Sequence, residues 1–305
     1  MENMVEKEVA VALESHFAQL VDAYENPNFY QNNTTHQISE PLCQYIKQFE
    51  GPREVLHKCC KNLVVSIVEK HKTYVKAQKN CNNILIHMLL YVAARVASCS
   101  EMPNTEVVVD LLSAIFDCDK SFRNLLMGAY FEPDVCFLVT HVQSVFSSLE
   151  EGLGAYRYFL QHTNKAKKYF VSNGFPRRMV DTNLQEAGIG HPAVFAIANR
   201  CLRTFKLLVE HGTNLDDYLE SHSASSLLEM IQLFIPENNT PEVKFCREVF
   251  TREHPEILAH EEQTLMMLSR KAIRRHLNRE FELPSGIDAL PIPGILKRYL
   301  HLDLD

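Results

Sequence analysis

The residues best suited to acid–base or metal chemistry gather in one short stretch, residues 253–262. Two histidines lie there among four glutamates: His254 and His260, with Glu253, Glu256, Glu261 and Glu262. Imidazole and carboxylate groups bind metals and exchange protons, so the stretch could form a metal site or an acid–base pair. The chain, however, has no His-Glu-x-x-His motif, no Gly-x-Ser-x-Gly motif and no glycine-rich phosphate loop. We therefore interpret the stretch as a charged, solvated approach to the helix after it, and we expect no enzymatic activity and no catalytic residue.

Other reactive side chains give no stronger indication of chemistry. His87 and His141 interrupt apolar stretches, where we expect hydrogen-bonded core or interface residues, and Ser269 has no basic partner placed by the sequence. The nine cysteines include the adjacent Cys59 and Cys60 but no Cys-x-x-Cys pair. This pattern predicts reduced thiols rather than a disulfide framework or a zinc ribbon. We predict no metal site and no cofactor.

Composition narrows the class of protein further. With 305 residues and 46% hydrophobic content, the chain can bury one large core or an extended stack of helices. A net charge of −7 argues against a general nucleic-acid binder. Residues 1–12 are too charged for a signal peptide, and the most apolar segment, 84–97, contains His87 and Arg95 and is too short to cross a bilayer. We expect no membrane partner and a cytoplasmic location, with the nucleus left open.

Apolar residues recur at helical spacing along almost the whole chain, and strand-like alternation is scarce. Residues 84–97 are apolar on most sides, which is typical of a buried helix, and residues 26–37 read as a polar loop. The pattern predicts an all-α fold. The predicted helices cover residues 5–24, 53–75, 84–97, 105–117, 121–131, 134–149, 154–171, 224–235 and 241–249.

The last forty residues contain a helix with two distinct faces. Its apolar residues fall on one side: Leu265, Leu268, Ala272, Ile273 and Leu277. Its basic residues fall on the other: Arg270, Lys271, Arg274 and Arg275. We interpret the basic run as the solvated side of the helix rather than a phosphate-binding patch. This apolar face is too small to form a core alone. It must therefore cover the rest of the chain or bind other proteins.

A proline-containing strut follows this helix. Pro291 and Pro293 exclude helix, so Leu290 to Pro293 should be extended and should present Ile292. A second amphipathic turn is predicted to begin near Gly294.

In order and spacing, this terminal segment resembles the SOCS box (suppressor-of-cytokine-signalling box). The first half of that family reads small-Leu-x-x-x-Cys-x-x-x-aliphatic, which corresponds here to Thr264, Leu265, Ser269 and Ile273. The second half reads Leu-Pro-aliphatic-Pro with a later aromatic-Leu pair, which corresponds to Leu290, Pro291, Ile292, Pro293, Tyr299 and Leu300.

The resemblance implies two binding sites. Elongin C would bind the first half of the box, through Leu265, Leu268, Ser269, Ala272 and Ile273. A cullin would bind the second half, through Leu290, Pro291, Ile292 and Pro293, and the Leu-Pro-aliphatic-Pro form points to cullin-5. One position departs from the family, because Ser269 stands where a cysteine is usual. A hydroxyl buried without a partner costs about 1–3 kcal/mol, so we expect elongin binding to survive but to be weaker.

A second resemblance lies within residues 191–214, which are similar to one ankyrin repeat. Pro192 stands at the first turn of a short helix, where its missing N–H costs nothing. Ala196 and Ala198 would let two antiparallel helices approach closely, and Gly212 falls where the chain must turn with a positive φ. No second clean copy lies 33 residues to either side, although residues 83–97 and 105–118 could be a worn one.

Together the two segments resemble the ankyrin repeat and SOCS box family, most of all a member with one recognisable repeat. The resemblance implies three regions: an N-terminal helical region at 1–80, a degenerate ankyrin-like region at 81–260, and a SOCS box at 261–305. It also implies a function, that of a non-catalytic substrate receptor of an elongin B/C and cullin-5 RING ubiquitin ligase. The partners would be elongins B and C, cullin-5 with its RING protein, and a target that the sequence does not name. The alternative is a scaffold whose terminal box packs on its own body and recruits nothing.

Overall fold

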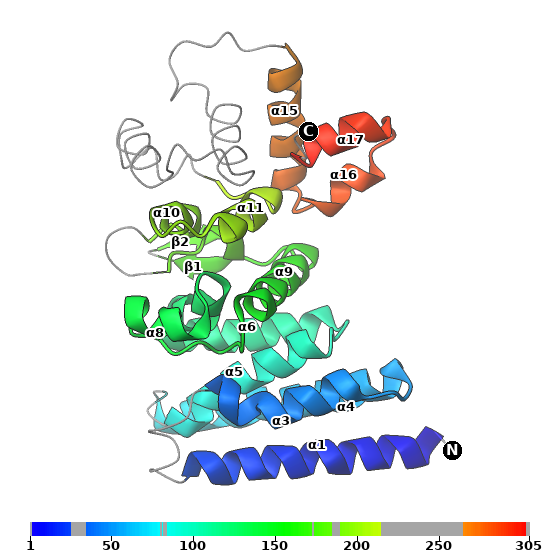
Figure 1. Cartoon of the computed structure of the whole chain (residues 1–305), viewed down its shortest axis with the longest axis vertical. Coiled ribbons are helices and arrows are strands. Elements are labelled where there is room, and N and C mark those ends of the chain that lie inside the picture. Colours follow the sequence, from blue (N-terminus) through cyan, green and yellow to red (C-terminus); the bar gives the residue numbers. More distant parts are fainter. Residues whose placement is uncertain are drawn as a thin grey trace. The chain divides into compact units, whose positions relative to one another are not determined.

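The computed structural model describes residues 2–25, 35–79, 81, 84–172, 174–184, 190–214 and 265–302. Helices dominate this part of the chain, which confirms the predicted all-α class (Figure 1). Contacts divide the chain into two compact units, residues 1–166 and 167–305. None of the described helices combines the length and the apolar character needed to cross a membrane.

The first unit is built from helices in successive layers (Figure 1). Its described elements are α1 (Glu2–Glu25), α3 (Thr35–Gln48), α4 (Arg53–Gln78), α5 (Ile84–Cys99), α6 (Thr105–Asp119), α7 (Arg123–Leu126), the 3-10 turn η1 (Met127–Ala129), α8 (Pro133–Thr140) and α9 (Leu149–Lys165).

Helix α5 is the centre of this unit, as its apolar sequence predicts. It packs against α3, α4, α6 and α9, and its residues Leu90, Val92 and Ala93 are fully buried. A helix surrounded on all sides has no polar face to present, which explains why its sequence shows no clear stripe. Helices α4 and α5, on either side of residue 80, pack together. The predicted boundary between an N-terminal region and an ankyrin-like region at that residue stays a prediction.

Arg95 is the one charged residue of α5, and it joins three helices. Its guanidinium is fully buried and donates to Glu40 of α3 and to both carboxylate oxygens of Glu151 of α9, at 2.9 and 3.0 Å. It also donates to the Ser39 hydroxyl at 2.8 Å and to the His36 carbonyl at 2.6 Å. These partners satisfy the buried charge, which would otherwise be strongly destabilising.

The second unit contains a short hairpin and two groups of helices. Its described elements are β1 (Phe170–Ser172), β2 (Phe175–Arg177), the 3-10 turn η2 (Met179–Asp181), α10 (Pro192–Ala198), α11 (Leu202–Glu210), α15 (Leu265–Arg279), α16 (Ser285–Ala289) and α17 (Gly294–Leu300). The strands are antiparallel, with Phe170 opposite Arg177 and Ser172 opposite Phe175.

Several predicted element bounds were wrong. The polar loop predicted at 26–37 ends earlier, because Ile38, Leu42, Cys43 and Ile46 form a buried stripe that carries α3 back to Thr35 despite Pro41. The predicted helix 134–149 ends at Thr140, and Ser148 caps a new helix by accepting from the Glu151 N–H.

The predicted helix 154–171 therefore begins at Leu149 and ends at Lys165, before strand β1. The predicted helices 224–235 and 241–249 lie outside the described residues. So does the histidine and glutamate stretch at 253–262.

Candidate docking surface

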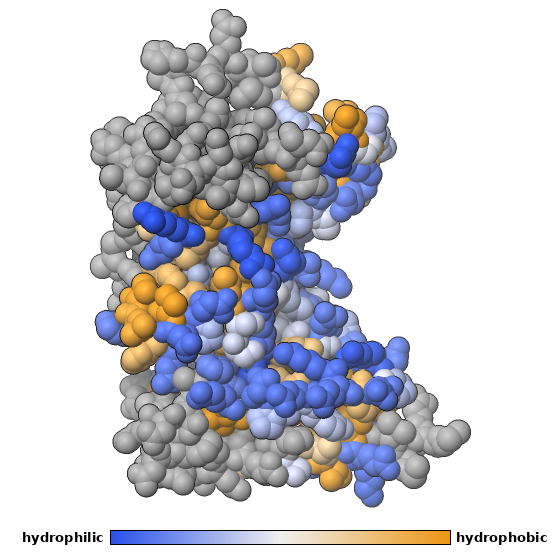
Figure 2. Space-filling view, in the orientation of Figure 1, coloured by the Kyte–Doolittle hydropathy of each residue, from blue (hydrophilic) through white to orange (hydrophobic). Residues whose placement is uncertain are grey.

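The apolar face of α15 is exposed. Leu265 is 80% exposed, Leu268 46% and Ile273 36%, and Ser269 and Ala272 are exposed beside them. The structure therefore brings all five predicted elongin-binding residues to one open face, which we call the α15 docking face. Thr264, the small residue of the predicted motif, lies outside the described residues. Figure 2 shows apolar side chains at the surface near the start of α15 and on α17.

The opposite face of α15 corrects the sequence interpretation. Arg270 and Arg274, predicted to be solvated, are 1% and 5% exposed, and Leu277, predicted on the apolar docking face, is buried with them. The guanidinium of Arg270 lies over the Tyr299 ring, 4.7 Å from its centroid. Stacking and hydrogen bonds make arginine tolerable in a buried position, so charge alone did not mark the solvent side.

Arg274 ties the helix to two other elements. Its guanidinium donates to the Leu300 carbonyl at the end of α17, at 2.7 Å, and to the Val209 carbonyl of α11, at 2.6 Å. Both acceptors lie in the last turn of their helices, where carbonyls lack i+4 partners, and the Val209 carbonyl also accepts from the Gly212 N–H at 3.0 Å. Arg270 and Arg274 thus turn inward together with Leu277, whereas Arg275 and the five residues of the α15 docking face are exposed.

Another buried arginine, Arg178, links α15 to the chain just after α11. Arg178 donates to the Gly212 carbonyl, to Asn278 of α15 and to Asp181, the last at 3.0 Å. Gly212 has a φ of +76°, and a side chain there would collide with Asn278. The positive φ confirms the prediction for Gly212 and shows why this position has to remain a glycine.

The rest of the terminal segment forms a small core of its own. Leu277, Leu283, Ile287 and Leu300 are buried together. Leu290 and Ile292 are partly buried against them, whereas Pro291 and Pro293 are exposed.

The strut is extended at Leu290, with φ −64° and ψ 137°, and α17 begins at Gly294, both as predicted. The prediction that the strut presents Ile292 is wrong in part, because the side chain packs inward. The four predicted cullin-binding residues therefore split into two that support the box and two that face solvent.

Sequence reasoning missed two exposed apolar residues on α17. Ile295 is 67% exposed and Leu296 42%, next to the exposed Pro293. Helical periodicity could not have found them, because Leu300 lies four residues after Leu296 on the same side of the helix and is buried.

The helix pair α10 and α11 has the local features predicted for it. Pro192 occupies the first turn of α10, Ala196 is fully buried where the two helices meet, and Arg200 takes a φ of +58° in the turn between them. These features establish a tight helix–turn–helix unit.

Other predicted residues have mixed outcomes. His87 is hydrogen-bonded, to the Tyr91 hydroxyl at 3.1 Å, as predicted. His141 is exposed and ends α8 with a φ of +57°, so the prediction of a core or interface position is wrong. No disulfide joins the cysteines that the structure describes, in agreement with the expectation of reduced thiols.

A second exposed apolar patch lies on α8, formed by Val135, Phe137, Leu138 and Val139 (Figure 2). It belongs to the first unit, whereas the α15 docking face belongs to the second.

Comparison with known families assigns the terminal segment. The SOCS box family model matches residues 263–301, a range that includes α15, α16 and α17. No curated protein and no solved structure matches the chain.

Proposed function

We propose, from the premise that residues 263–301 form a SOCS box, that this chain is the substrate-recognition adaptor of an elongin B/C and cullin-5 RING ubiquitin ligase. SOCS boxes are the segments through which such adaptors bind elongins and a cullin. The observation that carries the proposal is the orientation of α15, which buries Arg270 and Arg274 while Leu265, Leu268 and Ile273 remain exposed.

Elongin C would cover the α15 docking face. Fully burying one leucine contributes about 1.5–3 kcal/mol, and truncating a central anchor of an interface commonly costs more than about 2 kcal/mol. Leu265 has the most area to lose, because it is 80% exposed. We therefore assign Leu265 as the anchor, with Leu268, Ser269, Ala272 and Ile273 around it.

The cullin would bind the second half of the box. The sequence Leu290 to Pro293 favours cullin-5 over cullin-2, and its exposed Pro291 and Pro293 are the residues available for contact. Leu290 and Ile292 would act by holding the strut against the box core.

The rest of the chain would hold the target. We infer that α10 and α11 are one ankyrin-type repeat and that the other helices are related pairs that have diverged in sequence. The chain would act without bond chemistry of its own. It would hold a target lysine near a charged ubiquitin carrier, which raises the effective concentration of the two reactants. The cytoplasm, with or without the nucleus, is where this would take place.

The alternative, a scaffold whose box covers itself, predicts a buried Leu265. Its 80% exposure argues against that alternative.

The elongin half of the proposal is tested by co-expressing the chain with elongins B and C and measuring whether the three co-elute. Leu265→Asp should abolish co-elution, because it places a charge in the interface. Leu138→Asp is the matched control, since Leu138 is 75% exposed on α8 and lies outside the box. Co-elution that survives Leu265→Asp, or that the wild-type chain never shows, would refute the proposal.

The cullin half is tested separately with Pro291→Glu. Pro291 is exposed, so this change should leave the box core and elongin binding intact. We expect the affinity of the ternary complex for cullin-5 to fall at least about tenfold, as the loss of a central contact would. An unchanged dissociation constant in a titration with cullin-5 would show that the strut is not the cullin site.

A further inference from the structure

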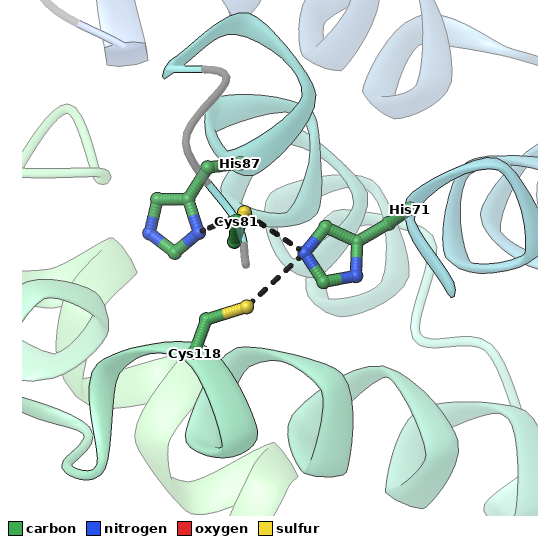
Figure 3. Close-up of side chains that lie close together, drawn as sticks. All are labelled: His71, Cys81, His87 and Cys118. Carbon is green, nitrogen blue, oxygen red and sulfur yellow. Dashed lines mark hydrogen bonds between the residues drawn. The ribbon is translucent and has the colours of Figure 1, made fainter. Parts of the chain in front are cut away.

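The first unit contains a cluster of four metal-ligating side chains that the proposed function does not use. His71 comes from α4, His87 from α5 and Cys118 from the last turn of α6, while Cys81 precedes α5. One ligand atom of each residue lies within 4.8 Å of the corresponding atom of every other. Figure 3 shows the Cys81 sulfur between the two imidazole rings and the Cys118 sulfur directed at His71.

Three distances within the cluster are close to those of a tetrahedral zinc site. Zinc lies about 2.3 Å from sulfur and about 2.0–2.1 Å from nitrogen, so the ligand atoms of a tetrahedron lie about 3.3–3.8 Å apart. The His71 Nε2 atom is 3.3 Å from the Cys81 sulfur and 3.2 Å from the Cys118 sulfur. The Cys81 sulfur is 3.7 Å from the His87 Nδ1 atom.

The surroundings of His87 fix which of its nitrogens faces the cluster. Its Nε2 atom lies 3.0 Å from the Asp119 carboxylate and 3.1 Å from the Tyr91 hydroxyl, which itself donates to Asp119. A proton on Nε2 leaves the lone pair on Nδ1, the atom that points to Cys81. A carboxylate behind a ligating histidine is the usual outer-shell partner of a zinc site.

We propose that His71, Cys81, His87 and Cys118 bind one structural zinc ion. Two thiolates and two neutral imidazoles balance the charge of Zn²⁺, which suits a half-buried site. Four protein ligands fill the tetrahedron and leave no position for water or substrate, so the ion is structural. It joins α4, α5 and α6 through side chains that are far apart in the sequence.

The geometry holds four donor atoms together, and a metal is the group that would use them all at once.

A second group of ligand-type residues, Cys43, Cys99 and Glu151, is a poorer candidate. Both oxygens of Glu151 already accept from Arg95, at 2.9 and 3.0 Å. The positive charge of that guanidinium would repel a metal ion. Cys99 therefore serves as the matched control for the four-residue cluster.

The test is metal analysis of the full chain purified with a non-chelating phosphine reductant. We expect about one zinc per chain after dialysis. Loading with Co²⁺ should give the visible bands of a tetrahedral, thiolate-bound ion. Cys118→Ser and His87→Asn should lose the zinc and those bands, whereas Cys99→Ser should keep both.

Measurements on the wild-type chain keep the proposal testable if the variants do not fold. A strong chelator should remove the zinc and lower the melting temperature by about 5 °C or more, because a structural metal stabilises only the folded state. Three results would overturn the proposal: a wild-type chain without zinc or cobalt bands, zinc retained by Cys118→Ser, or a Cys81–Cys118 disulfide in peptides mapped without reduction.

Discussion

The Ser269 side chain is exposed on the α15 docking face, and its hydroxyl makes no hydrogen bond to another of the described residues. Burial under elongin C would remove its hydroxyl from water without a partner from its own helix, at a cost of about 1–3 kcal/mol. A thiol behaves as a small apolar group and avoids this cost. We therefore expect Ser269→Cys to tighten elongin B/C binding in a calorimetric titration, and an unchanged or weaker affinity would contradict this.

Glu151 is the residue whose ionisation should matter most for stability. Burial alone would raise its pKa, but the hydrogen bonds and charge of Arg95, with further bonds from Ser147, lower it from 4.5 to about 2. A carboxyl whose pKa is lower in the folded state stabilises the fold at any pH above its unfolded-state pKa. This stabilisation is lost as the pH falls through the folded-state pKa. The affected window is therefore from about pH 4.5 down to about pH 2.

Glu151→Gln should remove that dependence. The variant should lose on the order of 3 kcal/mol of unfolding free energy at pH 7, because it breaks a buried charge pair. The loss should shrink as the pH falls through the window. Urea unfolding at a series of pH values measures both, with the exposed Glu69→Gln as control. Parallel pH profiles for wild type and Glu151→Gln would show that the pair is not linked to folding.

At the scale of elements, α15 is held by Leu277 in the small box core and by arginine donors to the ends of other helices. Arg274→Met keeps much of the side-chain volume but leaves the Val209 and Leu300 carbonyls without this donor. The Val209 carbonyl keeps the Gly212 N–H at 3.0 Å, whereas loss of the donor to the buried Leu300 carbonyl costs about 1–3 kcal/mol. We expect faster hydrogen exchange in α17 and at the end of α11, measured by mass spectrometry.

Arg275→Met is the comparison for that experiment, because Arg275 is exposed on the same helix. Equal exchange in the two variants would mean that the inward arginine does not hold the box.

For the whole molecule, the exposed docking face makes stability depend on partners. A ligand that binds only the folded state stabilises it by about 2.7 kcal/mol at a free concentration of one hundred times Kd. Saturating elongin B/C should therefore raise the melting temperature of the box-containing unit by several degrees in calorimetry. Leu265→Asp should show no such rise, and a rise of equal size in that variant would place the elongin contact elsewhere.

Local patterns predicted much of the architecture. The apolar run of α5 predicted a buried helix, Pro192 and Gly212 predicted the bounds of a helix pair, and the two prolines predicted the extended strut. Each of these depends on backbone chemistry or on periodicity within a short stretch. The start of α3 was missed because burial against other helices decided it. The end of α8 was missed because nothing in the local pattern marks His141, where φ is +57°.

The residues of the candidate site were likewise predicted where one helix carries them and missed where several elements do. The sequence identified the five residues of the α15 docking face, since all lie within nine positions of one helix. It assigned the wrong face to solvent for Arg270 and Arg274, because their partners Tyr299, Leu300 and Val209 come from other elements. The four ligands His71, Cys81, His87 and Cys118 carry no spacing signal either, since folding alone brings them within reach of one ion.

The sequence by itself determined that this chain is helical and ends in a box with an apolar stripe, because spacing along one helix fixes which residues share a face. Only the tertiary structure decided which face points outward and which distant side chains converge. Those outcomes depend on hydrogen-bond acceptors and ligand atoms from other elements. Their positions follow from packing and cannot be taken from the local order of residues.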